Sequence, residues 1–173
     1  EDDFKSLVTI FNLHEQLQYA TNIKQAAEDI YEWLNKEFKV DNLNFSLFDI
    51  NKNYKEEILV KGEEFFLDDN LSHFFIINTH TSLNATVSFS VSSKVHFKII
   101  EAKYNTIEAA FLQISPIIQS CILKKNYIES SSLDSVTNVY NRNYLIENLT
   151  SHLRLSNNKQ NEIYFLMVGI DHF

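Results

Sequence analysis

The chain has 173 residues, room for one ordinary domain and part of a second, and its 45% hydrophobic content excludes a disordered chain. A formal net charge of −8, with no dense block of Lys and Arg, excludes general binding to nucleic acid or to an anionic membrane surface. Two glycines and one cysteine exclude a glycine-rich phosphate loop, a disulfide framework and a cysteine zinc site.

No run of the sequence approaches the length of a membrane span, and no basic-then-apolar leader precedes a small-residue cleavage site. We therefore expect no membrane segment in this chain. The single cysteine, Cys121, lies among isoleucines and leucines and is predicted to be a small buried hydrophobe. Together these features indicate a cytoplasmic protein.

Two amphipathic helices are predicted at the start of the chain. Residues 4–19 repeat apolar side chains at helical spacing, near one face: Leu7, Ile10, Phe11, Leu13 and Leu17. Thr21 or Asn22 can cap a second helix. Its apolar stripe is broad: Ile23, Ala26, Ala27, Ile30, Trp33, Leu34 and Phe38.

The hydrophobic period then changes to two, which predicts strands over 44–50, 54–62, 72–80 and 83–93. The Asn-Lys-Asn turn at 51–53 indicates a hairpin, and the later two runs are typical of a second antiparallel pair. Ala85, Val87 and Phe89 face one way and alternate with Thr and Ser residues. The sequence thus predicts an α+β fold, an antiparallel sheet with helices on one side.

A long helix is predicted over residues 98–130, with an apolar stripe from Ile107 to Ile128. Pro116 should kink or break it. Because the stripe is thick, we expect part of it to cover the sheet and the rest to meet a second copy, giving a homodimer through this helix. The Ser-rich stretch at 129–133 is the predicted linker, followed by a helix over 141–155 and a buried-type strand over 163–170.

Residues 134–145, "DSVTNVYNRNYL", resemble the opening motif of the GGDEF diguanylate cyclase family, D-x-L-T-G-L-x-N-R-R-x-(F/L). Asp134, Thr137, Asn141, Arg142 and Leu145 match this motif. Asn138 stands where the family has glycine, and Asn143 replaces the second arginine. About one helix later, "LMVGIDHF" resembles the family's first strand, normally D-I-D-H-F-K. The resemblance implies that residues 134–173 are the N-terminal part of such a domain and that the chain stops inside it.

This resemblance implies a bacterial signalling protein that makes cyclic di-GMP from GTP with Mg²⁺. Carried over residue by residue, the principal metal-binding Asp falls on Gly169, which has no carboxylate. The carbonyl of Ile170 and the acid Asp171 would remain as metal contacts, and the backbone amides of His172 and Phe173 would touch phosphate. We therefore expect this chain to hold no cofactor and to be catalytically inactive, and a full-length parent to be degenerate or weak.

Several of these candidate site residues also have a simpler structural interpretation. Asp171 is favoured as a strand-end carboxylate that caps a turn. Asp134 and Arg142 are favoured as structural residues of the opening motif rather than catalytic ones. His73 and His80 flank one predicted strand, but seven residues apart they do not form a metal pair. The acidic pairs such as Glu56–Glu57 are expected to be solvated charges that discourage edge pairing.

Residues 1–128 resemble a GAF domain: two helices, a hairpin, further antiparallel strands and a long closing helix that continues into the output domain. A PAS domain is the nearest alternative. The segment "EEFFLDDNLS" is short where GAF domains carry a ligand-covering insertion, so the usual small-molecule pocket is in question. Three functions remain open: a sensory module with an unidentified small-molecule ligand, a ligand-free dimerisation module, and an active cyclase when full length.

Overall fold

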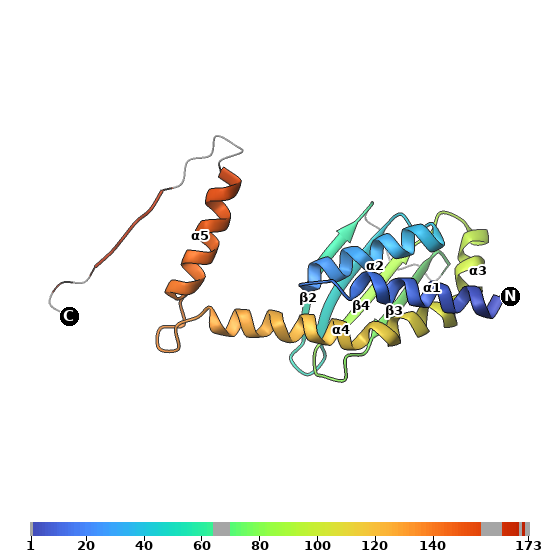
Figure 1. Cartoon of the computed structure of the whole chain (residues 1–173), viewed down its shortest axis with the longest axis horizontal. Coiled ribbons are helices and arrows are strands. Elements are labelled where there is room, and N and C mark those ends of the chain that lie inside the picture. Colours follow the sequence, from blue (N-terminus) through green and yellow to red (C-terminus); the bar gives the residue numbers. More distant parts are fainter. Residues whose placement is uncertain (1, 64–69, 157–163, 170, 172–173) are drawn as a thin grey trace. The chain divides into compact units, whose positions relative to one another are not determined.

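The structure is a computed structural model that describes residues 2–63, 70–156, 164–169 and 171. The chain divides into two compact units, Glu1–Asn126 (unit 1) and Tyr127–Phe173 (unit 2). The elements follow in the order α1 (Asp2–Leu17), α2 (Ile23–Phe38), β1 (Leu43–Asp49), β2 (Tyr54–Lys61), β3 (Ser72–Ile77), β4 (Asn84–Ser90), α3 (Lys94–Ala102), α4 (Tyr104–Ser131) and α5 (Arg142–Ser156). This arrangement confirms the predicted α+β class (Figure 1).

The sheet of unit 1 has four antiparallel strands in the order β2-β1-β4-β3. The hairpin between β1 and β2 turns where its composition predicts: the Asp49 carboxylate accepts hydrogen bonds from the backbone N–H groups of Asn51 (2.9 Å) and Lys52 (3.3 Å), and Asn53 adopts a left-handed φ of 48°. The register shifts between Phe45 and Ser46, which pair with Leu59 and Glu57, so Ile58 is the extra residue of a bulge in β2. Alternating residues of β1, β3 and β4 point into one core, to which β2 contributes the buried Leu59.

Trp33 joins three helices at the centre of that core. The side chain is 1% exposed, and its indole N–H donates to the Thr9 carbonyl of α1 at 3.0 Å. Its ring meets Phe38 edge-on at 5.2 Å and Phe111 of α4 at 6.1 Å. A buried indole must find an acceptor, and the carbonyl of α1 supplies it. The contacts of Trp33 thus tie α1, α2 and α4 together.

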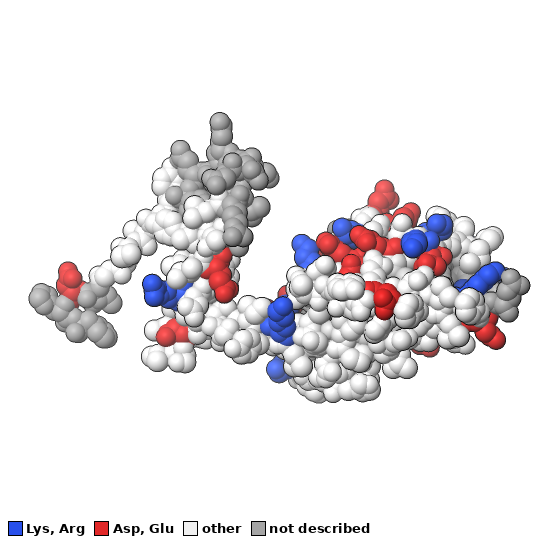
Figure 2. Space-filling view, in the orientation of Figure 1, with Lys and Arg blue, Asp and Glu red and all other residues white. Residues whose placement is uncertain are grey.

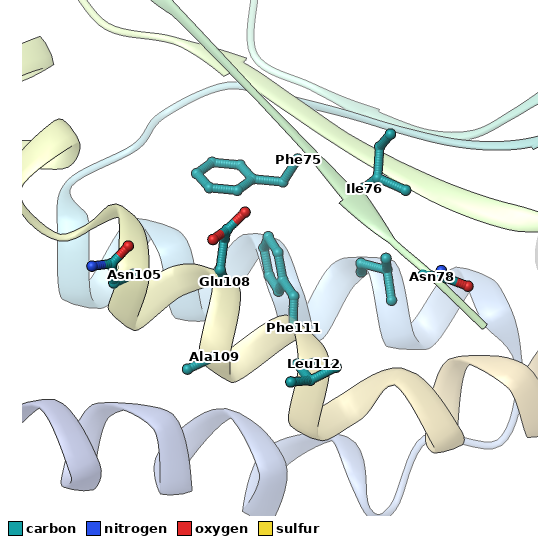
Figure 3. A pocket seen from close by; sticks show the side chains of 9 residues that line it. Phe75, Ile76, Asn78, Asn105, Glu108, Ala109, Phe111 and Leu112 are labelled. Atoms are coloured by element: carbon teal, nitrogen blue, oxygen red, sulfur yellow. The ribbon is translucent and has the colours of Figure 1, made fainter. Parts of the chain in front are cut away.

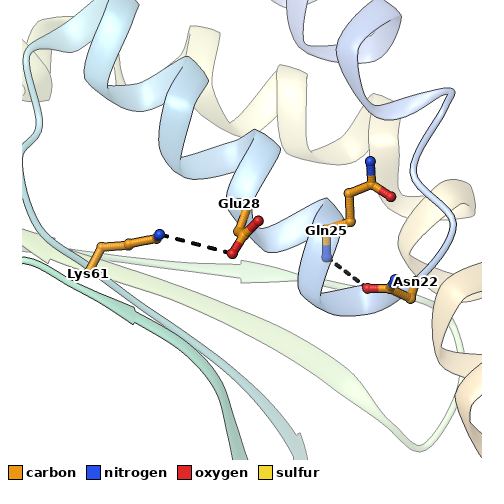
Figure 4. Close-up of polar contacts among 4 residues, drawn as sticks. All are labelled: Asn22, Gln25, Glu28 and Lys61. Carbon is orange, nitrogen blue, oxygen red and sulfur yellow. Dashed lines mark hydrogen bonds and ion pairs between the residues drawn. The ribbon is translucent and has the colours of Figure 1, made fainter. Parts of the chain in front are cut away.

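Helix α2 begins at a polar cap and is tied to the sheet by a charge pair (Figure 4). Of the two candidates for the cap, Asn22 is the N-cap residue, and its side-chain oxygen accepts from the Gln25 backbone N–H at 2.9 Å. Glu28, one turn later, lies 4.0 Å from the Lys61 ammonium at the end of β2. Because both partners of this pair are well exposed, the cap stabilises the helix more than the ion pair does.

The predicted single helix over 98–130 is wrong in one respect, because two helices occupy this region. Helix α3 ends at Ala102, where the Lys103 N–H turns back to the Ile100 carbonyl at 2.9 Å, and α4 begins at Tyr104. Helix α3 is capped at its start by Ser93, whose hydroxyl accepts from the His96 N–H at 3.1 Å. The apolar spacing runs on across the junction, so the break lies in backbone hydrogen bonding that the pattern does not show.

The expected break at Pro116 is also wrong, since α4 runs through it without interruption. A proline removes the hydrogen bond to the carbonyl four residues earlier, here that of Leu112. Both residues lie on the exposed side of the helix, with Leu112 69% exposed. Water can therefore satisfy the freed carbonyl, and the inner residues of α4 hold the helix to the sheet.

Among the described residues, α4 is long and apolar enough to cross a membrane by length and composition alone. This corrects the expectation that no run approaches such a length. In the structure, 44% of its apolar window is buried inside the protein. Ile107, Ile114 and Ile118 are fully buried against the sheet and neighbouring helices. The apolarity of α4 is therefore also what a core helix of a globular unit requires.

In unit 2, α5 covers almost the whole predicted helix, but the predicted buried strand is absent from the part described. Residues Tyr164–Val168 are between 64% and 96% exposed and pair with no strand among the described residues. A run becomes a strand only when a neighbouring strand satisfies its backbone groups. Residues 163 and 170 of that prediction lie outside the described residues.

Candidate functional site

The opening loop of unit 2 is organised around the carboxylate of Asp134. One oxygen of this side chain accepts from the Thr137 N–H (2.9 Å), the Thr137 hydroxyl (2.8 Å) and the Val136 N–H (3.2 Å). The hydrogen bonds from Thr137 and then from Val136 hold the pKa of Asp134 below its ordinary value. Asp134 therefore stays ionised and closes a turn, a structural arrangement rather than a catalytic one.

Asn138, which stands where the family motif has glycine, sits at a left-handed turn position with φ of 56°. Its N–H donates to the Asp134 carbonyl at 2.9 Å, and the Asp134 N–H donates across the loop to the Val139 carbonyl at 2.8 Å. Glycine adopts positive φ without strain, and Asn tolerates it better than most other residues. The loop therefore explains both the glycine of the motif and its replacement here.

Asn141 fastens this loop to the helices on either side. Its side-chain oxygen accepts from the Tyr144 N–H at 3.0 Å and so caps α5. Its side-chain N–H₂ donates to the Ser131 carbonyl at 2.6 Å, at the last residue of α4. Its backbone N–H donates to the Ser132 carbonyl at 2.7 Å. Arg142, the first residue of α5, is exposed and makes no hydrogen bond to Asp134, Thr137 or Asn141 in the described structure.

The positions that the resemblance assigns to metal and phosphate are only partly within the described residues. Gly169 is described, and a Cβ placed there would meet nothing within 4 Å. Asp171 is described as an exposed turn residue. Ile170, His172 and Phe173 lie outside the described residues. No group of three or more His, Cys, Asp or Glu side chains suited to a metal ion occurs in the described part, so we assign no catalytic step to Mg²⁺.

Unit 1 holds a pocket of about 380 Å³ between the edge strand β3 and α4, named here the β3–α4 pocket (Figure 3). Phe75 and Phe111 line its inner wall, and their rings meet nearly at right angles with centroids 5.5 Å apart. Glu108 supplies the charged group of the wall. Burial, and then a hydrogen bond with Glu108, raises the pKa of Tyr104, so this carboxylate already has a partner within the protein.

A second pocket, of about 490 Å³, opens among α1, the end of α2, α3 and the start of α4, and is named here the α1–α3 pocket. Lys5 and Thr9 come from α1, Phe38 ends α2, His96 comes from α3, and Thr106 lies in the first turn of α4. The ring nitrogen Nε2 of His96 lies 2.7 Å from the Phe38 carbonyl. Sequence reasoning missed this pocket because its walls come from four separate helices.

The histidines do not gather as metal ligands in the described part of the chain. His73 is instead a core residue of β3, 7% exposed and stacked on Phe97 of α3 with ring centroids 4.2 Å apart. Burial lowers the pKa of His73, outweighing the opposing effects of the Phe97 backbone and Glu101. Its Nε2 atom has no hydrogen-bond partner in the described structure. The folded protein therefore favours the neutral form of His73, which acts as a core residue rather than a metal ligand.

Of the acidic pairs, Glu56 and Glu57 have specific partners in unit 1. The Glu57 carboxylate accepts from the Asn44 amide at 2.7 Å. Glu56 accepts from the Tyr54 hydroxyl and lies 2.9 Å from the Lys125 ammonium of α4. Burial acts to raise the pKa of Glu56, but these two hydrogen bonds and the Lys125 charge lower it overall. Glu56 thus links β2 to α4.

The family model described as "Diguanylate cyclase, GGDEF domain" matches residues 131–173 of the chain. No curated protein and no solved structure matches. The matched segment begins at the last residue of α4 and contains the Asp134 loop and α5. The resemblance of residues 134–145 to the start of this domain is therefore supported, whereas the GAF resemblance of residues 1–128 stays a prediction.

Proposed function

We propose that residues 1–128 form a GAF-like sensory and dimerisation domain, joined by a linker at 129–133 to the start of a GGDEF-type output domain at 134–173. The protein would belong to a bacterial, cytoplasmic diguanylate-cyclase-type system that signals through cyclic di-GMP. The single observation that carries this proposal is the GGDEF match over residues 131–173, directly after a helix that is built into the core of unit 1.

Helix α4, which leads into the output segment, is also packed into the core of unit 1. Eight residues of α4 between Ile107 and Ile122 are buried in unit 1. The Ser115 hydroxyl donates to the Asn78 carbonyl just beyond β3, and Lys125 reaches Glu56 of β2. A helix held by its core side over about four turns moves with the sheet as one body. In the proposed mechanism, a change in the packing of unit 1 is transmitted to the output segment through this helix.

A second copy of the chain is the partner we assign to the outer surface of α1. Phe4, Leu7, Val8 and Phe11 follow each other at helical spacing on the side opposite Leu13 and Leu17, and are 71%, 64%, 42% and 56% exposed. We name these four residues the α1 stripe. Over α2, by contrast, Figure 2 shows acidic and basic side chains interspersed, the pattern of a solvated face. A contiguous exposed apolar stripe marks an interaction surface.

Helix α4 carries a matching outer row, named here the α4 stripe: Ala109, Leu112, Pro116 and Leu123. Leu112 and Leu123 are 69% and 55% exposed, and the row opposes the buried side of the helix. The α1 and α4 helices lie side by side, with the Thr106 hydroxyl 3.4 Å from that of Ser6. The two stripes thus come from neighbouring helices, and we propose that they pair with their counterparts across a two-fold axis.

Sedimentation of the chain tests this interface. We expect a dimer at tens of micromolar and a monomer for Leu7→Glu and Leu112→Glu, because each change buries a charge in an apolar contact. Val60→Glu is the matched control: Val60 is 41% exposed on β2, the edge strand opposite β3, and belongs to neither stripe. A monomeric wild type refutes the interface, and so does a dimer that only Val60→Glu dissociates.

The catalytic state of the output domain is a separate question that Gly169 makes testable. We propose that the complete gene product is weak or inactive because this position lacks the acid that the family uses for metal. Gly169→Asp introduces that acid at a position with open space around it. We expect Mg²⁺-dependent formation of cyclic di-GMP from GTP to rise in the variant. Strong synthesis by the unchanged protein would show instead an active cyclase that does not need this acid.

A further inference from the structure

We propose that unit 1 binds a small organic anion in the α1–α3 pocket: a carboxylate or a phosphate ester attached to an apolar body. This inference rests on the proposed sensory function and names the class of its ligand. At about 490 Å³ the pocket has the size of a small-molecule site, and all its lining residues belong to unit 1.

The charge of the pocket is opposite to that of the chain. Lys5, Lys39 and Lys103 line it together with His96, whereas Glu37 is its one acidic lining residue. The whole chain carries 23 Asp and Glu against 15 Lys and Arg. Three lysines around one hollow in an acidic protein create a local positive potential that attracts anions.

These three lysines differ from two others in unit 1 in having no ion-pair partner among the described residues. Lys61 and Lys125 pair with Glu28 and Glu56, but Lys5, Lys39 and Lys103 make no ion pair in the part of the chain that the structure describes. Among the described residues, the Lys39 ammonium donates to the Lys36 carbonyl, at 3.2 Å, and to no carboxylate. An anion in the pocket would therefore gain charge-assisted hydrogen bonds without displacing a protein carboxylate.

The first turn of α4 adds to this potential. Lys103 precedes the helix and Thr106 lies within its first turn, and both line the pocket. The first backbone N–H groups of a helix have no partner inside it, and the helix dipole places positive charge there. The hydroxyl groups of Ser6, Thr9 and Thr106 offer further donors to a carboxylate or phosphate.

The apolar part of the ligand has its own wall. Phe38 ends α2, and Ile99 of α3 leaves 55% of its side chain exposed at the pocket. Inorganic phosphate alone would leave this wall uncovered, whereas an anion with an alkyl or aryl body would cover it. The β3–α4 pocket also has an apolar wall, but its charged lining residue is an acid that already bonds Tyr104, so it does not offer a positive charge to an anion.

The experiment uses the 173-residue chain with three ten-carbon probes below their micelle concentrations: decanoate, decylamine and decanol, with decyl phosphate as a fourth arm. The only tryptophan, Trp33, bonds the Thr9 carbonyl and touches Phe38, both of which line the pocket. Its fluorescence therefore reports occupancy, and titration calorimetry gives the affinity. We expect decanoate or decyl phosphate to bind saturably, with an affinity that falls as salt is added. Decylamine should not bind, and decanol should bind more weakly than the anions.

Charge reversal identifies the site. Lys5→Glu and Lys103→Glu should each weaken anion binding about tenfold or more, the effect of losing one close charge contact. Lys24→Glu is the matched control, since Lys24 is an exposed residue in the first turn of α2 that does not line the pocket. The stronger of decanoate and decyl phosphate tells which anion the pocket favours.

Three outcomes overturn the inference: no saturable response to either anion, equal binding of decanol, or equal weakening by Lys24→Glu. Sedimentation of the same variants separates this failure from failure of the proposed function. If anions do not bind while Leu112→Glu still dissociates a dimer, the ligand class is wrong and the dimerisation module stands. If the wild type is monomeric yet binds decanoate, the dimer is wrong and the pocket stands.

Discussion

Acidification should destabilise unit 1 through His73, and replacing this residue by Phe should remove that effect. The imidazole is 7% exposed and lies between the rings of Phe97, Phe89 and Phe75, with centroids 4.2, 5.5 and 6.5 Å away. Among the charged groups near it, His96 opposes and Glu101 favours its protonation, while burial dominates and lowers the pKa. Protonation is thus harder in the folded state than in the unfolded chain.

The sign follows from proton binding. Below the unfolded pKa of about 6.5, His73 binds a proton in the unfolded chain but not in the folded protein. The contribution of the neutral His73 to stability is therefore complete above this pH and is lost as the pH falls. For one such histidine the free energy of unfolding drops by up to about 1.4 kcal/mol between pH 7.5 and 5.5. Urea unfolding followed by the fluorescence of Trp33, the chain's only tryptophan, measures this quantity for unit 1.

His73→Phe keeps the aromatic packing and removes both the titration and the unpartnered Nε2 atom. We expect its unfolding free energy to lose about 1 kcal/mol less than that of the wild type over the same pH range. His80→Asn is the matched control, because His80 is exposed and its left-handed φ of 58° suits Asn. If wild type and His73→Phe show the same pH slope, the reasoning from burial is wrong.

Three further predictions concern single positions. Gly62→Ala should lower the unfolding free energy of unit 1 by ~2 kcal/mol or more in urea, because φ is +74° and the new Cβ would lie 2.5 Å from the Asp41 carbonyl oxygen; an unchanged midpoint contradicts this. Asn138→Gly should leave the helicity of α5 unchanged by circular dichroism, whereas Asn138→Ala should reduce it through strain of ~1 kcal/mol at φ of 56°; equal spectra would show that the loop does not need this conformation. Cys121 is 5% exposed and burial raises the pKa of its thiol, so iodoacetamide should modify it at least ~10² times more slowly in the native protein than in urea, and comparable rates would place it at the surface.

Several elements of unit 1 were predictable because their apolar and polar residues recur with a regular period. In β4, Ala85, Val87 and Phe89 are fully buried and the residues between them are small and polar, so a period of two can be recognised directly. In α2 the seven buried residues are the seven of the predicted stripe. Where one face is apolar and the other is charged, the sequence leaves one possible orientation.

Helix α1 shows why the same reasoning fails elsewhere. The sequence places Leu7 and Phe11 on the core face with Leu13 and Leu17, yet the first two are exposed and the last two fully buried. This helix is apolar on two sides, and periodicity alone does not tell which side the sheet takes. Either apolar side of such a helix can pack on the core, and only the tertiary structure shows which one does.

The candidate sites also differ in how far the sequence alone could predict them. The Asp134 loop was visible as a motif because its residues are close in sequence and bond one another directly. Asn138 departs from the motif, and its meaning emerges only from its positive φ. The α1–α3 pocket gathers residues as far apart as Lys5 and Thr106, so no local pattern marks it. Metal and phosphate positions near Gly169 rest on the family resemblance and not on geometry.

The two helices that carry the outer stripes are held very differently, and this difference suggests how a ligand would act. Helix α4 is fixed to the sheet by eight buried residues, so it cannot turn without repacking the core. In α1, none of the described residues before Leu13 is buried. The part of α1 before Leu13 carries both Lys5 of the pocket and the α1 stripe. An anion that draws this part toward Lys103 at the start of α4 would fix the position of the α1 stripe, and with it the packing of two copies, without moving the core.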